Sequence, residues 1–445
     1  MKLTLLELLE ATGGGESGGT MVANTYSSFH TDSREVATGG VFFALRGAQM
    51  DGHRFVTDAI AKGAAAVVVD RRVDVMTGIA EILVPDTWAA LYAVAAYTLD
   101  RLRPLVVAVT GSNGKTSTKE MIGAILATHY EVLSTSGNLN TETGVPLTIL
   151  GLEPHHNALV LEMGMQHAGD IGRLAALARP HIGVVTNIGT VHLEFFSNRD
   201  ELARAKGELV AALPEQGLAV LNADDEFYSL LARMTSARVA SFGREHGDYR
   251  IEGYRVPAGG GSRFSVRGVE VTLAMSGRHQ ASNAAAALAA GEGAGVALAA
   301  GAAAVGLVTV EHRLQEIATD SGFSVVDDAY NASPESMLAA FEALAESPRR
   351  GRLLAVLSAM GELGPRADEA HREVGVRAAQ IFDAICVLAS DRGRVLADAS
   401  GAQVVPDRHA AVQWVKRNAR DGDLVLVKGS HASGLDQVVR ELTSS

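Results

Sequence analysis

The stretch VTGSNGKTST, residues 109–118, lies between an apolar run and a segment with helical spacing. The run LVVAVT at 105–110 predicts a buried strand, and the pattern after the glycines predicts a helix over 116–130. The residues that recur at helical spacing there are Thr118, Met121, Ile122, Ile125 and Leu126. A strand, a glycine loop and a helix in this order predict a phosphate-binding element at one edge of a parallel α/β sheet.

The loop itself indicates which phosphates it holds. Lys115 supplies a charge for the β- and γ-phosphates, and a hydroxyl of Thr116 or Ser117 can bind Mg²⁺. Val109 stands where the general G-x-x-x-x-G-K-[ST] pattern has another glycine, so the match to that pattern is incomplete. No NKxD string follows downstream, and its absence favours ATP over GTP. The predicted ATP-binding loop consists of Gly111, Ser112, Asn113, Gly114, Lys115, Thr116 and Ser117.

Strand-like runs alternate with helical ones in three successive blocks. At 445 residues the chain is long enough for two to four domains, and the blocks favour three. The predicted fold class is α/β: a small N-terminal α/β domain at 1–85, a central P-loop-type parallel sheet at 86–312 and a C-terminal Rossmann-like, doubly wound domain at 313–445.

Charge and composition exclude several classes of partner. A formal net charge of -12 argues against nucleic acid and anionic membranes. The single cysteine, Cys386, lies in an apolar strand-like run, so we expect a buried thiol and a reducing compartment. The N-terminus lacks the apolar core of a signal peptide, and residues 283–308 contain glycines and Glu292, so we expect a cytoplasmic protein without membrane insertion.

Polar side chains follow several of the predicted strands. The runs ALVLEMG, IGVVTNIG and GLAVLNADD all close on polar or acidic residues, and the carboxyl ends of parallel strands share one sheet edge. Mg²⁺ needs further oxygen ligands, so we expect Glu162 to bind it, with His192 nearby. Taken singly, each residue is also compatible with a solvated rim position or a structural role.

Several motifs together resemble one family. The strings TGSNGKTST, GNLNTETGVP, EMG, HLEFF, AKGEL, NADD and GRHQASNAAAA occur in the order found in the ATP-dependent Mur ligases of peptidoglycan precursor synthesis. The resemblance covers essentially the whole chain. Residues 31–55 look like the uridine-nucleotide-binding region of the members that add the third residue or the final dipeptide. DDAYNASPESM, AMGELG with His371 following, and LVKGSHASGLDQVV are similar to the member that adds D-alanyl-D-alanine.

The resemblance implies a reaction and a set of functional residues. A peptide carboxylate attacks the γ-phosphate of ATP, and the amine of D-alanyl-D-alanine displaces phosphate from the acyl phosphate. Lys115, Glu162, His192 and Lys206 would be catalytic. Thr116, Glu162, His192 and Lys206 would form the Mg²⁺ region, with Lys206 carrying a carbamate.

The resemblance also implies which residues bind the nucleotide and the two substrates. His279 and Asn283 would lie on the adenine side, and Arg313 and Asp327 would reach the nucleotide from the third domain. Asp328, Tyr330 and Asn331 would face the dipeptide. UDP-N-acetylmuramoyl-tripeptide would contact Ser33, Arg34, Asn138, Asn140 and Thr143, with Thr31 and Asp32 nearby. We expect a monomer.

Three features depart from the family pattern. NASP stands where many members have Asn-Ala-Asn-Pro-like strings, Ser358 stands where many have a small residue such as glycine, and VEHRLQ differs from the familiar Pro-Gly-Arg form. The alternatives are a third-residue Mur ligase, a folylpolyglutamate-synthase-like enzyme and a nucleotide-dependent switch that makes no bond. The third residue of the accepted peptide stays open between diaminopimelate, lysine and another diamino acid.

Overall fold

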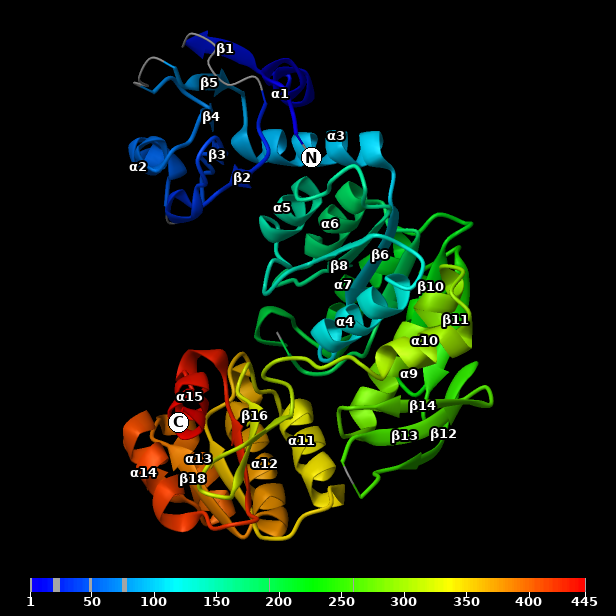
Figure 1. Ribbon diagram of the computed structural model, residues 1–445, viewed down its shortest axis with the longest axis vertical. Helices are drawn as coiled ribbons and strands as arrows, with labels where there is room; N and C mark the ends of the chain where they lie inside the picture. Colours follow the sequence, from blue (N-terminus) through cyan, green and yellow to red (C-terminus); the bar gives the residue numbers. More distant parts are fainter. Residues whose placement is uncertain are drawn as a thin grey trace. The chain divides into compact units, whose positions relative to one another are not determined.

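The structure is a computed structural model that describes residues 2–18, 25–47, 50–73, 78–191, 193–258 and 260–444. The chain packs into two compact units, which are described separately (Figure 1). The first contains Met1–Ala108, His129–Met165 and Gly169–His181, and the second contains Val109–Thr128, Gln166–Ala168 and Ile182–Ser445. Strand β6 (Leu105–Thr110) gives its first four residues to the first unit and its last two to the second.

A small sheet begins the first unit. Its strand order is β1-β5-β4-β3-β2, and all neighbours are parallel except β1 with β5. The strands are β1 (Gly15–Gly18), β2 (Phe29–His30), β3 (Val41–Phe43), β4 (Ala66–Val69) and β5 (Ala80–Leu83). Every residue of β3 and β4 is buried, which explains the uninterrupted apolar runs that predict them.

The helices of the first unit begin at polar caps that the sequence supplies. Asp86 accepts hydrogen bonds from the backbone N–H groups of Trp88 and Ala89 and starts α3. Thr4 and Glu7 form a capping box at the start of α1. The helices are α1 (Leu5–Thr12), α2 (Val56–Ala61), α3 (Thr87–Leu102), α5 (Gly144–Leu150) and α6 (Asp170–Ala178), and the parallel pair β7 (Val132–Ser134) and β8 (Ala158–Glu162) completes the unit.

The second unit carries a sheet in the order β14-β13-β12-β11-β10-β9. Strands β9 to β12 are parallel, and β12 to β14 form an antiparallel meander. The strands are β9 (Ile182–Val185), β10 (Leu218–Asn222), β11 (Arg238–Gly243), β12 (Tyr249–Arg255), β13 (Ser262–Val266) and β14 (Val269–Leu273). The associated helices are α4 (Lys115–Leu126), α7 (Arg199–Ala211), α8 (Tyr228–Arg233), α9 (Arg278–Gly293) and α10 (Leu298–Val305).

A six-stranded sheet follows in the same unit, in the order β15-β16-β20-β17-β18-β19. Only β15 runs antiparallel to its neighbour. The strands are β15 (Gln315–Ala318), β16 (Ser324–Asp328), β17 (Leu353–Leu357), β18 (Ala384–Leu388), β19 (Gln403–Val405) and β20 (Leu424–Lys428). The helices are α11 (Pro334–Glu346), α12 (Ala367–Ile381), α13 (Asp391–Ser400), α14 (Arg408–Asn418) and α15 (Asp436–Thr443).

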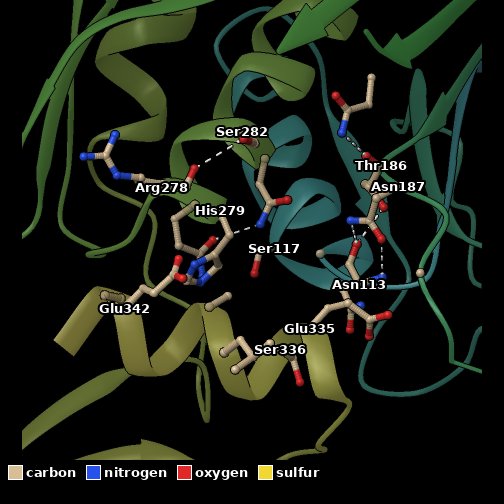
Figure 2. A pocket seen from close by; sticks show the side chains of 18 of the residues that line it. Asn113, Ser117, Thr186, Asn187, Arg278, His279, Ser282, Glu335, Ser336 and Glu342 are labelled. Carbon is tan, nitrogen blue, oxygen red and sulfur yellow. Dashed lines mark hydrogen bonds between the residues drawn. The ribbon is translucent and has the colours of Figure 1, made fainter. Parts of the chain in front are cut away.

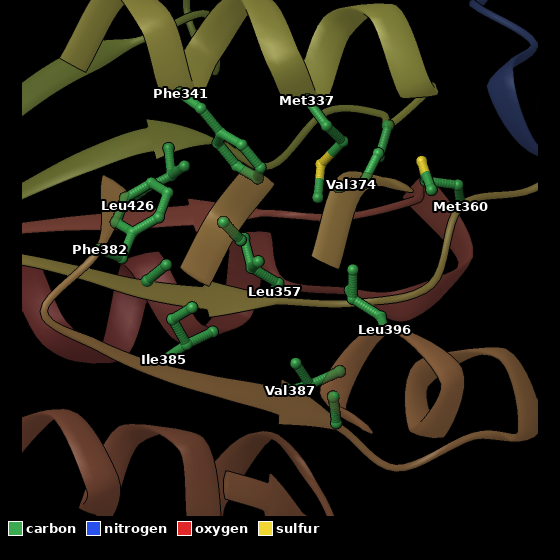
Figure 3. Packing of buried hydrophobic residues seen from close by; sticks show 14 of the residues in the cluster. Met337, Phe341, Leu357, Met360, Val374, Phe382, Ile385, Val387, Leu396 and Leu426 are labelled. Atoms are coloured by element: carbon green, nitrogen blue, oxygen red, sulfur yellow. The ribbon is translucent and has the colours of Figure 1, made fainter. Parts of the chain in front are cut away.

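Helices cover both faces of this sheet because successive strand residues point to opposite sides. Leu353, Ala355 and Leu357 of β17 belong to the core under α11, α12 and α13, whereas Leu354 and Val356 belong to the core under α14 and α15. Figure 3 shows the first of these cores, in which Phe341 meets Phe382 edge to face at a centroid distance of 5.0 Å. Burying one such side chain contributes about 1.5–3 kcal/mol.

The α/β fold class and the doubly wound third block are therefore confirmed. Cys386 is buried in β18, as expected, and burial raises the pKa of its thiol. Residues 283–308, which raised the question of a membrane span, contain most of α9 and all of α10. In the described part of the chain, no helix combines the length and hydropathy needed to traverse a bilayer.

His371 fastens the loop after β17 to helix α12. It is fully buried, its Nε2 accepts a hydrogen bond from the backbone N–H of Met360 at 2.9 Å, and its Nδ1 donates to the carbonyl of Ala367 at 2.6 Å. Burial lowers the pKa of His371, so the ring is neutral at neutral pH, as this donor and acceptor pattern requires.

We expect His371→Ala to destabilise the protein by about 2–3 kcal/mol, because it leaves a cavity and two buried backbone groups without partners. The measurement is the melting temperature at pH 8 by calorimetry, with the exposed His409→Ala on α14 as control. Equal melting temperatures for the two variants would contradict the assigned role.

Candidate active site

The phosphate loop leaves no room for side chains at its two glycines. Gly111 and Gly114 have φ angles of +145° and +82°, a region that residues with a Cβ atom rarely adopt. A Cβ atom at Gly111 would lie 1.9 Å from Oγ1 of Thr186, and one at Gly114 would lie 2.4 Å from Oδ1 of Asn283. The glycines therefore permit both the turn and the close approach of the segments after β9 and in α9.

Side chains after β9 hold the loop in place. The backbone N–H of Asn113 donates to Oδ1 of Asn187 at 3.0 Å, and its carbonyl accepts from Nδ2 of Asn187 and from the Thr186 hydroxyl at 3.0 and 2.6 Å. The Ser112 hydroxyl accepts from the backbone N–H of Gly189 at 2.8 Å. These four hydrogen bonds to residues 186–189 fix the backbone of the loop that is predicted to bind the phosphates.

Two lysine amines converge on one carbonyl of this loop. Lys115 Nζ lies 2.9 Å and Lys206 Nζ lies 3.1 Å from the carbonyl oxygen of Gly111. Lys206 comes from α7 and is 1 % exposed. Burial, together with the charge of Lys115, holds the pKa of Lys206 well below its usual range. The surroundings of Lys206 therefore disfavour the charged form of its amine.

A cavity of about 540 Å³ opens beside the loop within the second unit. Of the predicted site residues, Asn113, Gly114, Thr116, Ser117, His279, Asn283, Arg313 and Asp328 line it. Figure 2 shows Glu335, Ser336 and Glu342 of helix α11 on the side of the cavity facing Ser117 and His279. The other predicted residues of this unit that the structure describes do not line the cavity.

Helix α11 contacts the phosphate loop through the residue that caps its N-terminus. Ser333 is the N-cap of α11, and its hydroxyl donates to Oδ1 of Asn113 at 3.1 Å. Farther along the helix, Glu346 pairs with Arg278 of α9 at 3.0 Å, and the Arg278 guanidinium lies 4.6 Å from the centre of the Tyr254 ring. The capping position that departs from the family string is thus a contact to the phosphate loop.

A buried ion pair forms part of the cavity wall. Lys428 Nζ lies 2.6 Å from Asp328 Oδ2 and donates to the carbonyl of Asn331 at 3.1 Å. The Arg313 guanidinium lies 4.4 Å from the centre of the Tyr330 ring. Burial lowers the pKa of His279 to about 4, so this imidazole is neutral beside the positive charges of Lys428 and Arg313.

The two adjacent aspartates of β16 have different surroundings. Among the described residues that line the cavity, Asp328 is present and Asp327 is not. Asp327 is 1 % exposed, and its oxygens accept from the backbone N–H of Ala329 at 3.1 Å and from His312 Nδ1 at 2.5 Å. We expected Asp327 to reach the nucleotide and Asp328 to face the dipeptide. In the structure it is Asp328 that lines the cavity beside the phosphate loop.

The first unit contains the remaining predicted residues in two groups. Glu162, at the end of β8, accepts from Asn140 Nδ2 at 2.8 Å, and its buried Oε2 has no hydrogen-bond partner in the described chain. Asn138 and Thr143 lie in the same loop as Asn140, between β7 and α5. Ser33 and Arg34 lie in the first 3-10 helix, where Arg34 pairs with Asp32 at 2.6 Å. His192 lies outside the described residues.

Several lining residues were not predicted. Thr186 and Asn187 follow β9, Asn222 is the last residue of β10, and Asp224 and Asp225 follow β10, so their strand-end position was a usable signal. Glu335, Glu342 and Glu346 share one face of α11, but a helical acidic face is ordinarily solvated, and the sequence does not show what it faces. Arg244, Arg278 and Lys428 also line the cavity, and the sequence likewise does not show what their side chains face.

We expect Gly114→Ala to weaken ADP binding at least about 100-fold, because the new Cβ displaces either Asn283 or the loop backbone. The measurement is titration calorimetry in the presence of Mg²⁺. Gly295→Ala is the control, since Gly295 has a φ of +91° with no atom within 4 Å of a Cβ. Normal affinity in Gly114→Ala would contradict the proposed fit.

Comparison with known proteins assigns the chain to a family. Three family models match it in succession: "Mur ligase family, catalytic domain" at residues 25–130, "Mur ligase middle domain" at 109–291 and "Mur ligase, glutamate ligase domain" at 312–431. The UDP-N-acetylmuramoyl-tripeptide--D-alanyl-D-alanine ligase of Bacillus subtilis is 37% identical over 428 residues, with 93% of each chain covered. The enzyme of that name from Escherichia coli K12 is 34% identical, covering 99% of this chain and 98% of its own.

Solved structures agree with this assignment. The crystal structure of MurF from Acinetobacter baumannii superposes with a TM-score of 0.91 at 30% identity and covers 99% of both chains. The MurF ligase of Thermotoga maritima in complex with ADP gives a TM-score of 0.82 at 31% identity, with 93% of this chain and 96% of its own covered. With its three-domain architecture and its phosphate loop, the chain belongs to the Mur ligase family.

Proposed function

We propose that this chain is the ATP-dependent ligase that joins D-alanyl-D-alanine to UDP-N-acetylmuramoyl-tripeptide in peptidoglycan precursor synthesis. The observation that carries the proposal is the loop at Gly111–Ser117, closed against Asn187 and opening on a cavity large enough for a nucleotide. Relatives with that activity in their name match the chain over nearly its full length.

The reaction has two steps. An oxygen of the tripeptide carboxylate attacks the γ-phosphorus of ATP, the bond to the β-phosphate oxygen breaks, and ADP leaves. The neutral amine of D-alanyl-D-alanine then attacks the acyl carbon, phosphate leaves and the amine loses a proton. Because a carboxylate is a poor electrophile, activation is required, and holding the reactants together contributes about 7–11 kcal/mol to lowering the barrier.

The nucleotide seat is assigned to residues of the second unit. Lys115 and the backbone N–H groups of the loop bind the phosphates, and His279 and Asn283 bind the adenosine end. Arg313 and Asp328 complete the seat from the C-terminal part, as their place in the cavity wall supports. Asp328 takes the role that the sequence suggested for Asp327.

One observation in particular supports Mg²⁺ binding by the predicted ligands. The buried Oε2 of Glu162 has no hydrogen-bond partner in the described chain, as expected for an oxygen that serves a cation. From the family resemblance, we propose that Thr116, Glu162, His192 and Lys206 serve Mg²⁺ binding. When bound, Mg²⁺ neutralises phosphate charge.

The burial of Lys206 supports our proposal that its amine carries a carbamate. An uncharged Nζ can attack CO₂, form an N–C bond and release one proton, which leaves an anionic carbamate. The lowered pKa of Lys206 supplies that uncharged amine, and an ammonium here would repel both Lys115 and a metal ion.

The other substrates are assigned to two further groups of residues. Ser33, Arg34, Asn138, Asn140 and Thr143 would bind the uridine-nucleotide peptide, and Tyr330 and Asn331 would bind the dipeptide near the carboxyl edge of the third sheet. We also propose domain boundaries at 85/86 and 312/313 and a cytoplasmic monomer.

The deciding experiment measures phosphate release from ATP and Mg²⁺ with UDP-N-acetylmuramoyl-tripeptide, with and without D-alanyl-D-alanine. We expect release to require both substrates and a matching mass gain in the product. Lys115→Ala should abolish release, and Lys416→Ala, on the exposed face of α14, should not. Release with a single amino acid in place of the dipeptide would point to a sister ligase, and ADP binding without turnover would point to a switch.

We expect the carbamate to give a distinct ¹³C resonance when the protein is equilibrated with ¹³C-bicarbonate. The signal should be absent in Lys206→Ala and present in Lys416→Ala, and it should weaken as CO₂ is removed. An identical spectrum for the parent chain and Lys206→Ala would refute the modification.

A further inference from the structure

The segment Glu311–Leu314, which leads into β15, has an unusual backbone. His312 and Leu314 have φ angles of +56° and +52°, so two residues that carry a Cβ atom are left-handed on either side of Arg313. This conformation is disfavoured for such residues and persists only where the surroundings enforce it. Arg313 is the residue between them that lines the nucleotide cavity.

A buried carboxylate, that of Asp327, contacts this segment. Nδ1 of His312 donates to Oδ2 of Asp327 at 2.5 Å, and Gln315, the first residue of β15, pairs in register with Asp327. The carboxylate is itself fixed, because its Oδ1 accepts from the backbone N–H of Ala329 at 3.1 Å. The His312 side chain is 40 % exposed, so packing alone does not hold it.

The backbone conformation at His312 affects where the guanidinium of Arg313 lies. Arg313 lies 4.4 Å from the Tyr330 ring centre and close to the pair formed by Asp328 and Lys428. If the backbone at residue 312 returned to an ordinary φ, the direction of the chain at Arg313 would change. The contact with Asp327 therefore supplies the constraint that keeps Arg313 at the cavity wall.

We propose that Asp327 and His312 are positioning residues: Asp327 holds His312 left-handed and so places Arg313 against the nucleotide. The proposal rests on the proposed function, since it takes the ligand of Arg313 to be ATP or ADP. It gives Asp327 an indirect role in place of the direct nucleotide contact that the sequence suggested.

The test compares His312→Ala with His312→Gly in the full chain, with ADP and Mg²⁺ as the titrated ligand. Both variants lose the imidazole, but only glycine adopts the left-handed conformation without strain. We expect His312→Ala to raise the Kd for ADP about fivefold or more, and His312→Gly to keep it within about twofold of the parent chain.

A double-mutant cycle then tests Asp327. Asp327→Ala should raise the Kd about fivefold in the parent chain and less than about twofold in the His312→Gly background. Arg103→Ala and Arg103→Gly are the controls, because Arg103 is also left-handed, at φ +47°, after helix α3 in the other unit. They should change the melting temperature without changing the Kd.

Two results would overturn the proposal alone: equal weakening by His312→Ala and His312→Gly, or equal loss on Asp327→Ala in both backgrounds, which would make Asp327 a direct contact. If Asp327→Ala does not fold, the two His312 variants still decide, because they leave the carboxylate in place. A parent chain that binds no ADP would overturn the proposed function and this inference together.

Discussion

The close approach of the loop backbone at Gly111 and Gly114 to Thr186 and Asn283 is the constraint on which the rest of the site depends. Because no Cβ atom intervenes, the loop meets the segment after β9 on one side and α9 on the other. The hydrogen bonds from Asn187 and Thr186 then fix the Asn113 carbonyl, and the Gly111 carbonyl can accept from two lysines. A larger residue at either glycine would disturb all of these contacts.

The capping chemistry of α11 links this loop to the C-terminal sheet. Ser333 serves as the N-cap and also donates to Asn113, so the start of the helix is tied to the phosphate loop. The ion pair of Arg278 with Glu346 ties its other end to α9. Helix α11 therefore forms one wall of the cavity while its opposite face packs on the sheet through Met337 and Phe341.

The sequence predicted the elements better than it predicted the side-chain partners. Apolar runs such as LVVAVT and AAAVVVD identify buried strands, because burial on both faces leaves a continuous signal. The difference between Asp327 and Asp328 could not be predicted, since adjacent strand residues point to opposite sides and the pattern does not say which side holds the cavity. The left-handed backbone at His312 was not predicted either, although His312 stands where the familiar Pro-Gly-Arg form has a glycine, the residue that adopts a positive φ without strain.

The acidic face of α11 determines the sign of the charge on the cavity wall. The ionised side chains lining it are four basic residues (Arg244, Arg278, Arg313, Lys428) and six acidic ones (Asp224, Asp225, Asp328, Glu335, Glu342, Glu346), a balance of four minus six, or two negative charges. A bare triphosphate adds further negative charge to this wall, whereas a cation-bound one adds less. Without Glu335, Glu342 and Glu346 the balance would be four minus three, or one positive charge, so the glutamates of α11 reverse the sign of the charge on this wall.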